Sequence, residues 1–363
     1  MKKKTKKLKD ISIIRTGKLD SNVAVTNGKY PFFTCDPKTL SIDTWAYDTE
    51  AVLLAGNNAS GNYTAKYFHG KFNAYQRTYI IETADEDVLN VRFLCYAINL
   101  QLRLLKTMSS GSTTKFLTIR MLNELDIPCP DIETQRKIVS ILSAYDDLIE
   151  NNQRQIKLLE EAAQRLYKEW FVDLRFPGYE HTPIVDGVPE GWERKAIGNI
   201  IGKIARTTQI SASDYSTVGE IPIVDQSRDF IAGYTNDLGA MVDIGKPVIV
   251  FGDHTRILKY IQFPFAKGAD GTQLIVSDDE RMPQSLFYCS LVNVDLSNYH
   301  YARHFKYLKA ETILVPTKDI AEMFDALVTP IYSKIQTLRD SSTMAEHARD
   351  RLLPKLMSGE WEV

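Results

Sequence analysis

The chain has 363 residues, of which 44% are hydrophobic and 25% are charged. This composition is typical of a globular protein, and the length predicts two domains. A membrane protein is excluded because no apolar run reaches the ~18 residues that cross a bilayer. The basic start MKKKTKKLKD has no apolar stretch behind it, which argues against a secretory signal. The net charge of −2 excludes bulk attraction to nucleic acid, so DNA binding would require a local basic face.

The first globule is predicted over residues 1–131. Short apolar runs separated by Gly, Asn and Asp predict strands at 11–15, 32–35, 51–55 and 79–82. Apolar residues at helical spacing then predict one helix over 91–107.

The next segment, 132–175, has the most regular pattern in the chain. Its apolar residues step by four and three positions, the heptad spacing with which one helix buries a stripe against another. The predicted seam comprises Ile138, Leu142, Tyr145, Ile149, Asn152, Ile156, Leu159, Leu166 and Trp170. Asn152 is the polar member, and such a residue typically fixes the register of a helix pair.

A linker and a second globule are predicted over 176–318, followed by a second long helix over 319–358. The less regular seam of this helix comprises Leu327, Ile331, Ile335, Leu338 and Leu352. Pro330 is expected to kink the helix or to delay its first turns. We expect the two long helices to pack antiparallel against each other.

The order globule, helix, globule, helix reflects a repeat. Residues 51–81 read AVLLAGNNASGNYTAKYFHGKFNAYQRTYII, and residues 246–276 read KPVIVFGDHTRILKYIQFPFAKGADGTQLIV. Both segments run from an apolar strand through a polar turn and an aromatic-basic stretch to another apolar strand. The predicted fold is therefore α+β, with two globular domains that contain small mixed sheets, two long antiparallel coiled-coil helices and pseudo-two-fold symmetry.

Motifs for catalysis are missing from the sequence. There is no Walker loop, GxSxG or HExxH motif, and no Asn/Asp-Pro-Pro-aromatic segment of an adenine methyltransferase. His300 and His304 are four residues apart but lack a third ligand nearby, and the four cysteines form no CxxC pair. We therefore expect a non-enzymatic chain without a metal site, located in a reducing cytoplasm.

Polar and basic residues gather instead at matching places in the two repeats. Asn, Gln, Arg and Lys side chains match base edges and phosphates, so these clusters are predicted to bind DNA. In the first domain they are Asn57, Asn58, Ser60, Tyr63, Lys66, Tyr67, Lys71, Gln76, Arg77, Ser112, Thr113, Thr114 and Lys115. In the second they are Asp253, His254, Arg256, Lys259, Lys267, Gln273, Tyr301, Arg303, His304 and Lys306.

The chain resembles the specificity subunits of type I restriction–modification systems. The resemblance is carried by IPCPDIETQRKIVSILSAYDDLIENNQRQIKLLEEAAQRLYKEWF at 127–171, GVPEGWERKAIGNI at 187–200 and GSTTKFL at 111–117. It implies two target-recognition domains, each of which reads one half of a bipartite site in double-stranded DNA. It also implies two modification subunits that carry the methyl donor and adenine methylation, and two restriction subunits that use ATP and Mg²⁺.

Two other interpretations remain open. The chain could be the specificity subunit of a methylation-only or type II-like system, which its neighbouring genes would reveal. It could also be a coiled-coil adaptor that binds only proteins. An adaptor would show no salt-sensitive DNA binding, whereas a protein that contacts phosphates should bind DNA more weakly as salt rises.

Overall fold

The structure is a computed structural model that describes residues 5–59, 61–109, 115–299 and 303–363. The chain forms two compact units, and each is described by itself. Unit 1 consists of residues 1–150 and 342–363, and unit 2 consists of residues 151–341. The two long helices, α5 (Ile132–Tyr167) and α8 (Lys318–Ser358), each contribute one part to unit 1 and one part to unit 2. None of the described helices is both long and apolar enough to cross a membrane.

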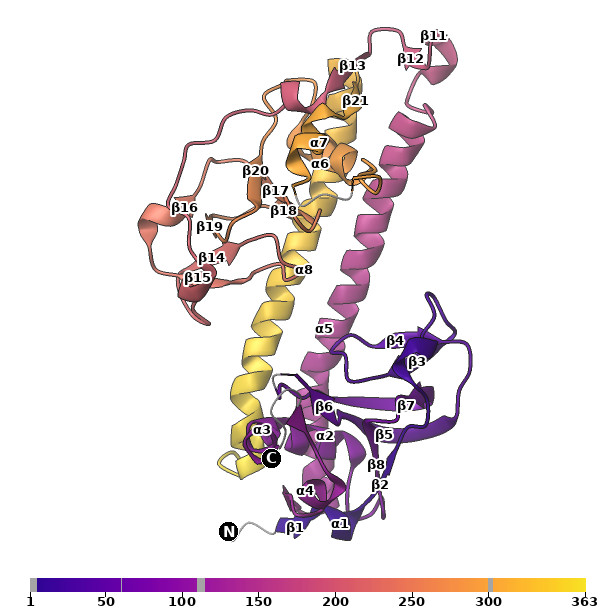
Figure 1. The fold of residues 1–363 in the computed structure, drawn as a ribbon, viewed down its shortest axis with the longest axis vertical. Coiled ribbons are helices and arrows are strands. Elements are labelled where there is room, and N and C mark those ends of the chain that lie inside the picture. Colours follow the sequence, from indigo (N-terminus) through magenta and orange to yellow (C-terminus); the bar gives the residue numbers. More distant parts are fainter. Residues whose placement is uncertain (1–4, 60, 110–114, 300–302) are drawn as a thin grey trace. The chain divides into compact units, whose positions relative to one another are not determined.

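A six-stranded mixed sheet forms the centre of unit 1 (Figure 1). Its order is β2-β8-β5-β7-β3-β4, with bounds β2 Ser12–Thr16, β3 Tyr30–Phe33, β4 Leu40–Ile42, β5 Tyr47–Ala55, β7 Ala65–Ala74 and β8 Thr78–Thr83. All neighbours are antiparallel except β3 and β7, where Phe33 lies opposite Ala74 in a parallel pair. The second half of β5 is buried, as its apolar sequence AVLLA predicts.

The remaining elements of unit 1 are short. They are α1 (Leu8–Ile11), η1 (Ser21–Val23), α2 (Val91–Leu100), α3 (Leu102–Met108), α4 (Ile119–Asn123), the pair β1 (Thr5–Lys7) and β10 (Asp126–Pro128), and the pair β6 (Asn57–Asn58) and β9 (Lys115–Phe116). The helix predicted over 91–107 is thus interrupted at Gln101. Its side chain donates a hydrogen bond to the Asp126 carbonyl, which ties the interruption to the end of the domain.

Unit 2 contains two smaller sheets. The four-stranded sheet has the order β15-β14-β19-β16, with β14 Ile221–Val224, β15 Gly233–Thr235, β16 Met241–Val242 and β19 Phe265–Lys267. The three-stranded sheet has the order β18-β17-β20, with β17 Val248–Gly252, β18 Leu258–Ile261 and β20 Thr272–Ile275.

The other elements of unit 2 frame these sheets. They are η2 (Lys168–Val172), which is a π-helix, η3 (Tyr179–His181), the hairpin β11 (Ile184–Val185) and β12 (Val188–Pro189), the pair β13 (Glu193–Ala196) and β21 (Thr312–Val315), η4 (Ile197–Asn199), η5 (Ala212–Asp214), η6 (Leu238–Ala240), α6 (Gln284–Val292) and α7 (Phe305–Ala310).

The strand pairings repeat between the units. The parallel pair of β3 with β7 corresponds to the parallel pair of β14 with β19. In both units a buried central strand, β5 or β17, lies between two antiparallel neighbours. The β1–β10 and β13–β21 pairs then precede α5 and α8 in the same way. The α+β fold class and the repeated order of elements are therefore as predicted.

A motif missed in the sequence repeats as well. The α2 sequence FLCYAIN and the α6 sequence FYCSLVN share Phe, Cys and Asn at the same spacing. In both helices the Asn side chain donates a 2.9 Å hydrogen bond to the Cys carbonyl one turn earlier, Asn99 to Cys95 and Asn293 to Cys289.

The two long helices run antiparallel within each unit. In unit 1, Ile138 and Leu142 of α5 share a core with Leu353, Leu356 and Met357 of α8. In unit 2, the Phe171 and Phe324 rings lie 5.1 Å apart, and Asn152 donates to the Ser341 hydroxyl at 3.2 Å. The seam predicted for α5 is buried at Ile138, Leu142, Ile149, Asn152 and Trp170 and half-buried at Tyr145, Ile156, Leu159 and Leu166.

The prediction for α8 is wrong at Leu327, which is 51% exposed. Its neighbour Val328 is fully buried, in line with Phe324 and Ile335, while Ile331 and Leu352 are half-buried and Leu338 is buried. Pro330 does not delay the helix, because α8 already begins at Lys318. The side chains on the buried face, rather than the local proline, set the register of this helix.

Candidate nucleic-acid interface

The first polar cluster surrounds turn 1, the described residues 56–59, 61 and 62, which follow the central strand β5. The Gly56 N–H donates to the Arg77 carbonyl at 2.8 Å, and the Gly56 carbonyl accepts from the Leu117 N–H at 2.8 Å. The β6–β9 pair places Asn57 opposite Phe116 and Asn58 opposite Lys115. Three segments that the sequence analysis singled out separately therefore meet at one end of the sheet.

Cationic side chains from neighbouring segments surround turn 1. Lys106 donates to the Asn62 side-chain oxygen at 2.7 Å, and the Arg77 guanidinium lies 5.4 Å from the Phe116 ring centre. Gly61 has a φ of +72°, and a Cβ there would lie 3.2 Å from Lys106 Cγ and 3.3 Å from Lys115 Cγ. The sequence analysis missed Lys106 because nothing in the α3 sequence shows that this lysine reaches the turn.

Other predicted residues of the first domain lie elsewhere. Tyr63 is 5% exposed and belongs to the core, so it is not available to a ligand. Lys66 donates to the Thr39 hydroxyl at 3.1 Å, and burial lowers its pKa while Asp36 partly offsets that effect. Lys71 lies over the exposed Trp45 ring at 4.5 Å. Gln76 is exposed.

The second cluster surrounds turn 2, residues 253–257, which follows the central strand β17. Two predicted DNA-binding residues of this cluster, Asp253 (6% exposed) and His304 (5% exposed), are buried and hydrogen-bonded to each other's segments. The Asp253 carbonyl accepts from the His304 N–H at 2.8 Å, and the Asp253 carboxylate accepts from the Phe305 N–H at 2.7 Å. The sequence pattern correctly brought these segments together, but these two side chains hold the loop rather than face a ligand.

Lys259 is also buried rather than exposed. Its ammonium group donates to the Asp225 carbonyl at 2.8 Å and to the Asp229 carbonyl. Burial lowers its pKa, and the carboxylates of Asp225 and Asp229 act in the opposite direction. Lys259 therefore holds the segment after β14 and is not available to a phosphate.

The remaining predicted residues of this domain can reach a ligand. His254, Arg303 and Lys306 are exposed, and Lys267 and Gln273 are half-buried. Arg256 is exposed in the left-handed region at φ +61°, and its guanidinium donates to the Leu296 carbonyl at 3.0 Å. The predicted residues Ser60, Ser112, Thr113, Thr114 and Tyr301, and the candidate metal ligand His300, lie outside the described residues.

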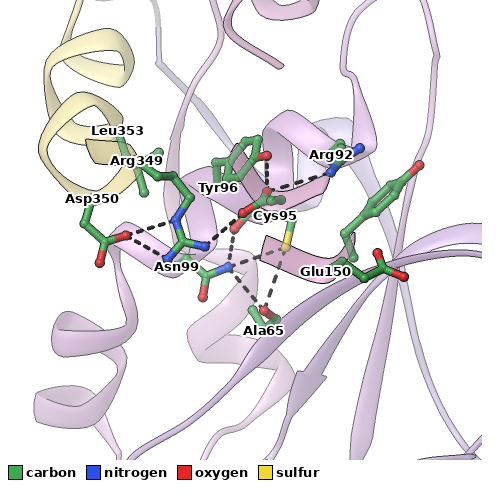
Figure 2. Close-up of a pocket in the computed structure, with 11 residues that line it drawn as sticks. Ala65, Arg92, Cys95, Tyr96, Asn99, Glu150, Arg349, Asp350 and Leu353 are labelled. Atoms are coloured by element: carbon green, nitrogen blue, oxygen red, sulfur yellow. Dashed lines mark hydrogen bonds and ion pairs between the residues drawn. The ribbon is translucent and has the colours of Figure 1, made fainter. Parts of the chain in front are cut away.

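A polar cavity of about 510 Å³ lies elsewhere in unit 1, between β7, α2, α5 and α8 (Figure 2). Asp146 of α5 is its hub. It accepts from the Tyr96 hydroxyl at 2.5 Å and from Arg349 at 2.9 Å, and Arg92 lies 3.8 Å away. The predicted DNA-binding residue Tyr67 also lines this cavity, and its hydroxyl donates to Glu50 at 2.7 Å.

These contacts join domain 1 to the helix pair within unit 1. Burial raises the pKa of the Cys95 thiol to about 12, so this lining residue is a neutral thiol and not a reactive thiolate. The ion pairs of Asp146 connect α2 with α5 and α8, which identifies the cavity as part of a structural joint.

The corresponding joint in unit 2 is more aromatic. A cavity of about 240 Å³ is lined by the rings of Tyr260, Tyr288 and Tyr332. The Tyr260 and Tyr332 ring centres are 4.8 Å apart, and Arg339 lies 4.0 Å over the Phe230 ring while pairing with Glu160 at 2.8 Å. Among the described residues, no group of three or more His, Cys, Asp or Glu side chains could hold a metal ion in either unit.

Comparisons with known proteins agree with the sequence resemblance. Residues 1–161 match the family model described as type I restriction modification DNA specificity domain. The MjaIX specificity subunit of Methanocaldococcus jannaschii is 29% identical over 286 residues, which are 71% of this chain and 66% of that protein. The EcoDI specificity subunit of Escherichia coli is 33% identical over 162 residues, which are 45% of this chain and 35% of that protein. The alignments thus span less than two thirds of both relatives.

The fold likeness extends over nearly the whole chain. The crystal structure of the type I restriction-modification S subunit from M. genitalium has a TM-score of 0.62 at 17% identity, covering 97% of this chain and 95% of that chain. This match includes the second domain and α8, which the family model does not reach. The first half of the chain is therefore similar in sequence to type I restriction–modification specificity subunits, and nearly the whole chain shares the fold of an S subunit.

Proposed function

We propose that this chain reads a bipartite site in double-stranded DNA, one half with each domain, and positions the subunits that act on that DNA. The observation that carries the proposal is the repeated site. In both units a polar turn follows the buried central strand and lies against a second segment, residues 115–117 in unit 1 and 303–306 in unit 2. Two similar domains with different side chains at the same place suit an asymmetric DNA site with two halves.

The side chains at the two turns have suitable chemistry for this role. Turn 1 offers the amides of Asn58 and Asn62, and α3 and β9 add the cations Lys106 and Lys115 beside it. Amides can pair with adenine edges, and cations can contact guanine edges and phosphates. Because the net charge of the chain is −2, DNA affinity would come from these local cations and should fall steeply with salt.

We further propose that α5 and α8 dock two modification subunits. Both helices expose large apolar side chains besides their buried seam, and exposed apolar groups of this kind suit protein partners. They are Ile141, Leu148 and Met344 in unit 1, and Leu158, Met323 and Leu327 in unit 2. In this proposal the chain itself is not catalytic. The modification subunits bring the methyl donor, and two restriction subunits bring ATP and Mg²⁺.

The test is to co-express the chain with its neighbouring modification gene and to map methylated adenines by single-molecule sequencing. We expect one asymmetric motif with two short defined halves and an undefined gap of fixed length. Expression of the modification subunit without this chain is the control and should give no such motif. A continuous motif without a gap, or methylation that does not depend on this chain, would overturn the proposal.

A further inference from the structure

We propose that Gln226 is a positioning residue that holds His254 ready for contact with a base in the half-site read by domain 2. This inference rests on the proposed function. Sequence analysis singled out His254, whereas Gln226 follows β14 and lies outside both repeated segments.

Gln226 connects two loops of domain 2. Its side-chain oxygen accepts from the backbone N–H of His254 at 3.1 Å, and its backbone carbonyl accepts from the Thr255 hydroxyl at 2.7 Å. Its side-chain nitrogen donates to the Asp270 carbonyl at 2.7 Å. One half-buried glutamine thereby ties turn 2 to the loop that precedes β20.

The imidazole of His254 packs against the loop that Gln226 holds. Gly271 has a φ of +84°, and a Cβ at this position would lie 2.6 Å from both Gln226 Nε2 and His254 Cδ2. The ring therefore rests directly against the Gly271 backbone, although His254 is exposed. A further bond, from the Gln209 side chain to the Asp270 carboxylate at 3.2 Å, fixes the loop that Gln226 holds. A side chain fixed in this way loses less conformational entropy when it binds.

The equivalent position in domain 1 supports its polar turn with a different side chain. The parallel pairs of Phe33 with Ala74 and of Val224 with Lys267 align Cys35 with Gln226. The Cys35 thiol donates to the Arg77 carbonyl at 3.5 Å and also has hydrogen-bond contacts with the backbone N–H groups of Gly56 and Asn57 in turn 1. Turn 1 is held by these contacts and by the β6–β9 pair, so each domain fixes its polar turn with different residues.

The experiment uses the complex of the full chain with its modification subunit and a library of sites that carry single base substitutions in either half. Methylation rates give the discrimination at every position. Gln226→Met keeps the side-chain length but removes both side-chain hydrogen bonds, and Gln226→Glu keeps the oxygen that accepts from His254. Val218→Ala is the control, because Val218 is 74% exposed in the same domain.

We expect His254→Ala and Gln226→Met to reduce discrimination about tenfold at the same base positions of one half-site, within the range of a lost base contact. The other half-site should be unaffected, and Gln226→Glu should stay within about threefold of the wild type. A wild-type profile for Gln226→Met, or for His254→Ala, would overturn the inference. Unfolding temperatures of the complexes identify any general loss of folding. If the Gln226→Met complex does not assemble, the inference is judged from the other two variants. It then requires that His254→Ala lose discrimination at the expected positions and that Gln226→Glu keep it.

This result is separable from the test of the proposed function. If the wild-type complex lacks a bipartite motif, the proposed function fails. If the wild-type motif is present and the His254 and Gln226 variants leave it unchanged, only the inference about these residues fails.

Discussion

At the scale of single residues, burial separates side chains that hold the loops from those that can contact DNA. Sequence analysis placed Asp253, His304 and Lys259 correctly in the second cluster, but all three are buried and bonded to the backbone. Local sequence cannot show this, because the bonding partners come from distant segments. The supporting residues Gln226 and Lys106 were missed for the same reason.

Asp146 provides a test at this scale. Asp146→Ala removes the acceptor shared by Tyr96 and Arg349, and the loss should cost about 2–3 kcal/mol of unfolding free energy, as for hydrogen bonds to charged groups. A double-mutant cycle with Arg349→Ala, followed by chemical denaturation, should give a coupling energy of about 1 kcal/mol or more.

Asp350→Ala is the matched control for this cycle. Asp350 also pairs with Arg349, but its side chain is 62% exposed, so its loss should cost less than about 1 kcal/mol. Equal effects of Asp146→Ala and Asp350→Ala would show that Asp146 is not the hub of the joint.

At the scale of elements, prediction succeeded where a periodic pattern decides the structure. The regular steps of α5 gave its buried stripe, because a helix pair imposes this spacing directly. In α8 the pattern is less regular, and Leu327 was chosen in place of Val328, while the predicted Ile335 and Leu338 are buried. Strand β7 was missed because its sequence AKYFHGKFNA lacks a continuous apolar run. Its hydrogen-bonded pairing with β5 makes it a strand.

The seam can be tested with two leucines. Leu142 of α5 is fully buried among residues of domain 1 and α8, so Leu142→Ala should cost about 2–5 kcal/mol of unfolding free energy. Leu327→Ala is the matched control and should change stability by less than about 0.5 kcal/mol, as expected for an exposed position. Thermal or urea unfolding of the full chain without its proposed partners measures both, and similar losses would contradict the seam described for α8.

At the scale of the whole molecule, the repeat is the property that the sequence revealed most clearly. Two segments with little identity run through the same order of strands, and the structure reproduces this order in both units. Differences in side chains at the two turns were visible as well. Loop geometry was not, because it depends on hydrogen bonds such as those of Gly56 with Arg77 and Leu117.

The repeat predicts that the domains act independently. Replacing residues 1–131 with the corresponding domain of a similar specificity subunit should change one half of the methylated motif and leave the other half and the gap unchanged. Methylation mapping of the chimaeric complex measures this outcome. A reciprocal replacement of residues 176–318 is the control and should change only the opposite half. If either exchange altered both halves, the domains would not be separate readers.

The division of α8 between the units affects how the chain is made. The core of unit 1 includes Leu353, Leu356 and Met357, which are translated only after the whole of domain 2. Domain 1 therefore cannot complete its packing until this part of α8 has left the ribosome. A deletion of residues 342–363 would leave domain 2 with its own part of α8 and expose apolar surface on domain 1, which precedes domain 2 in the chain.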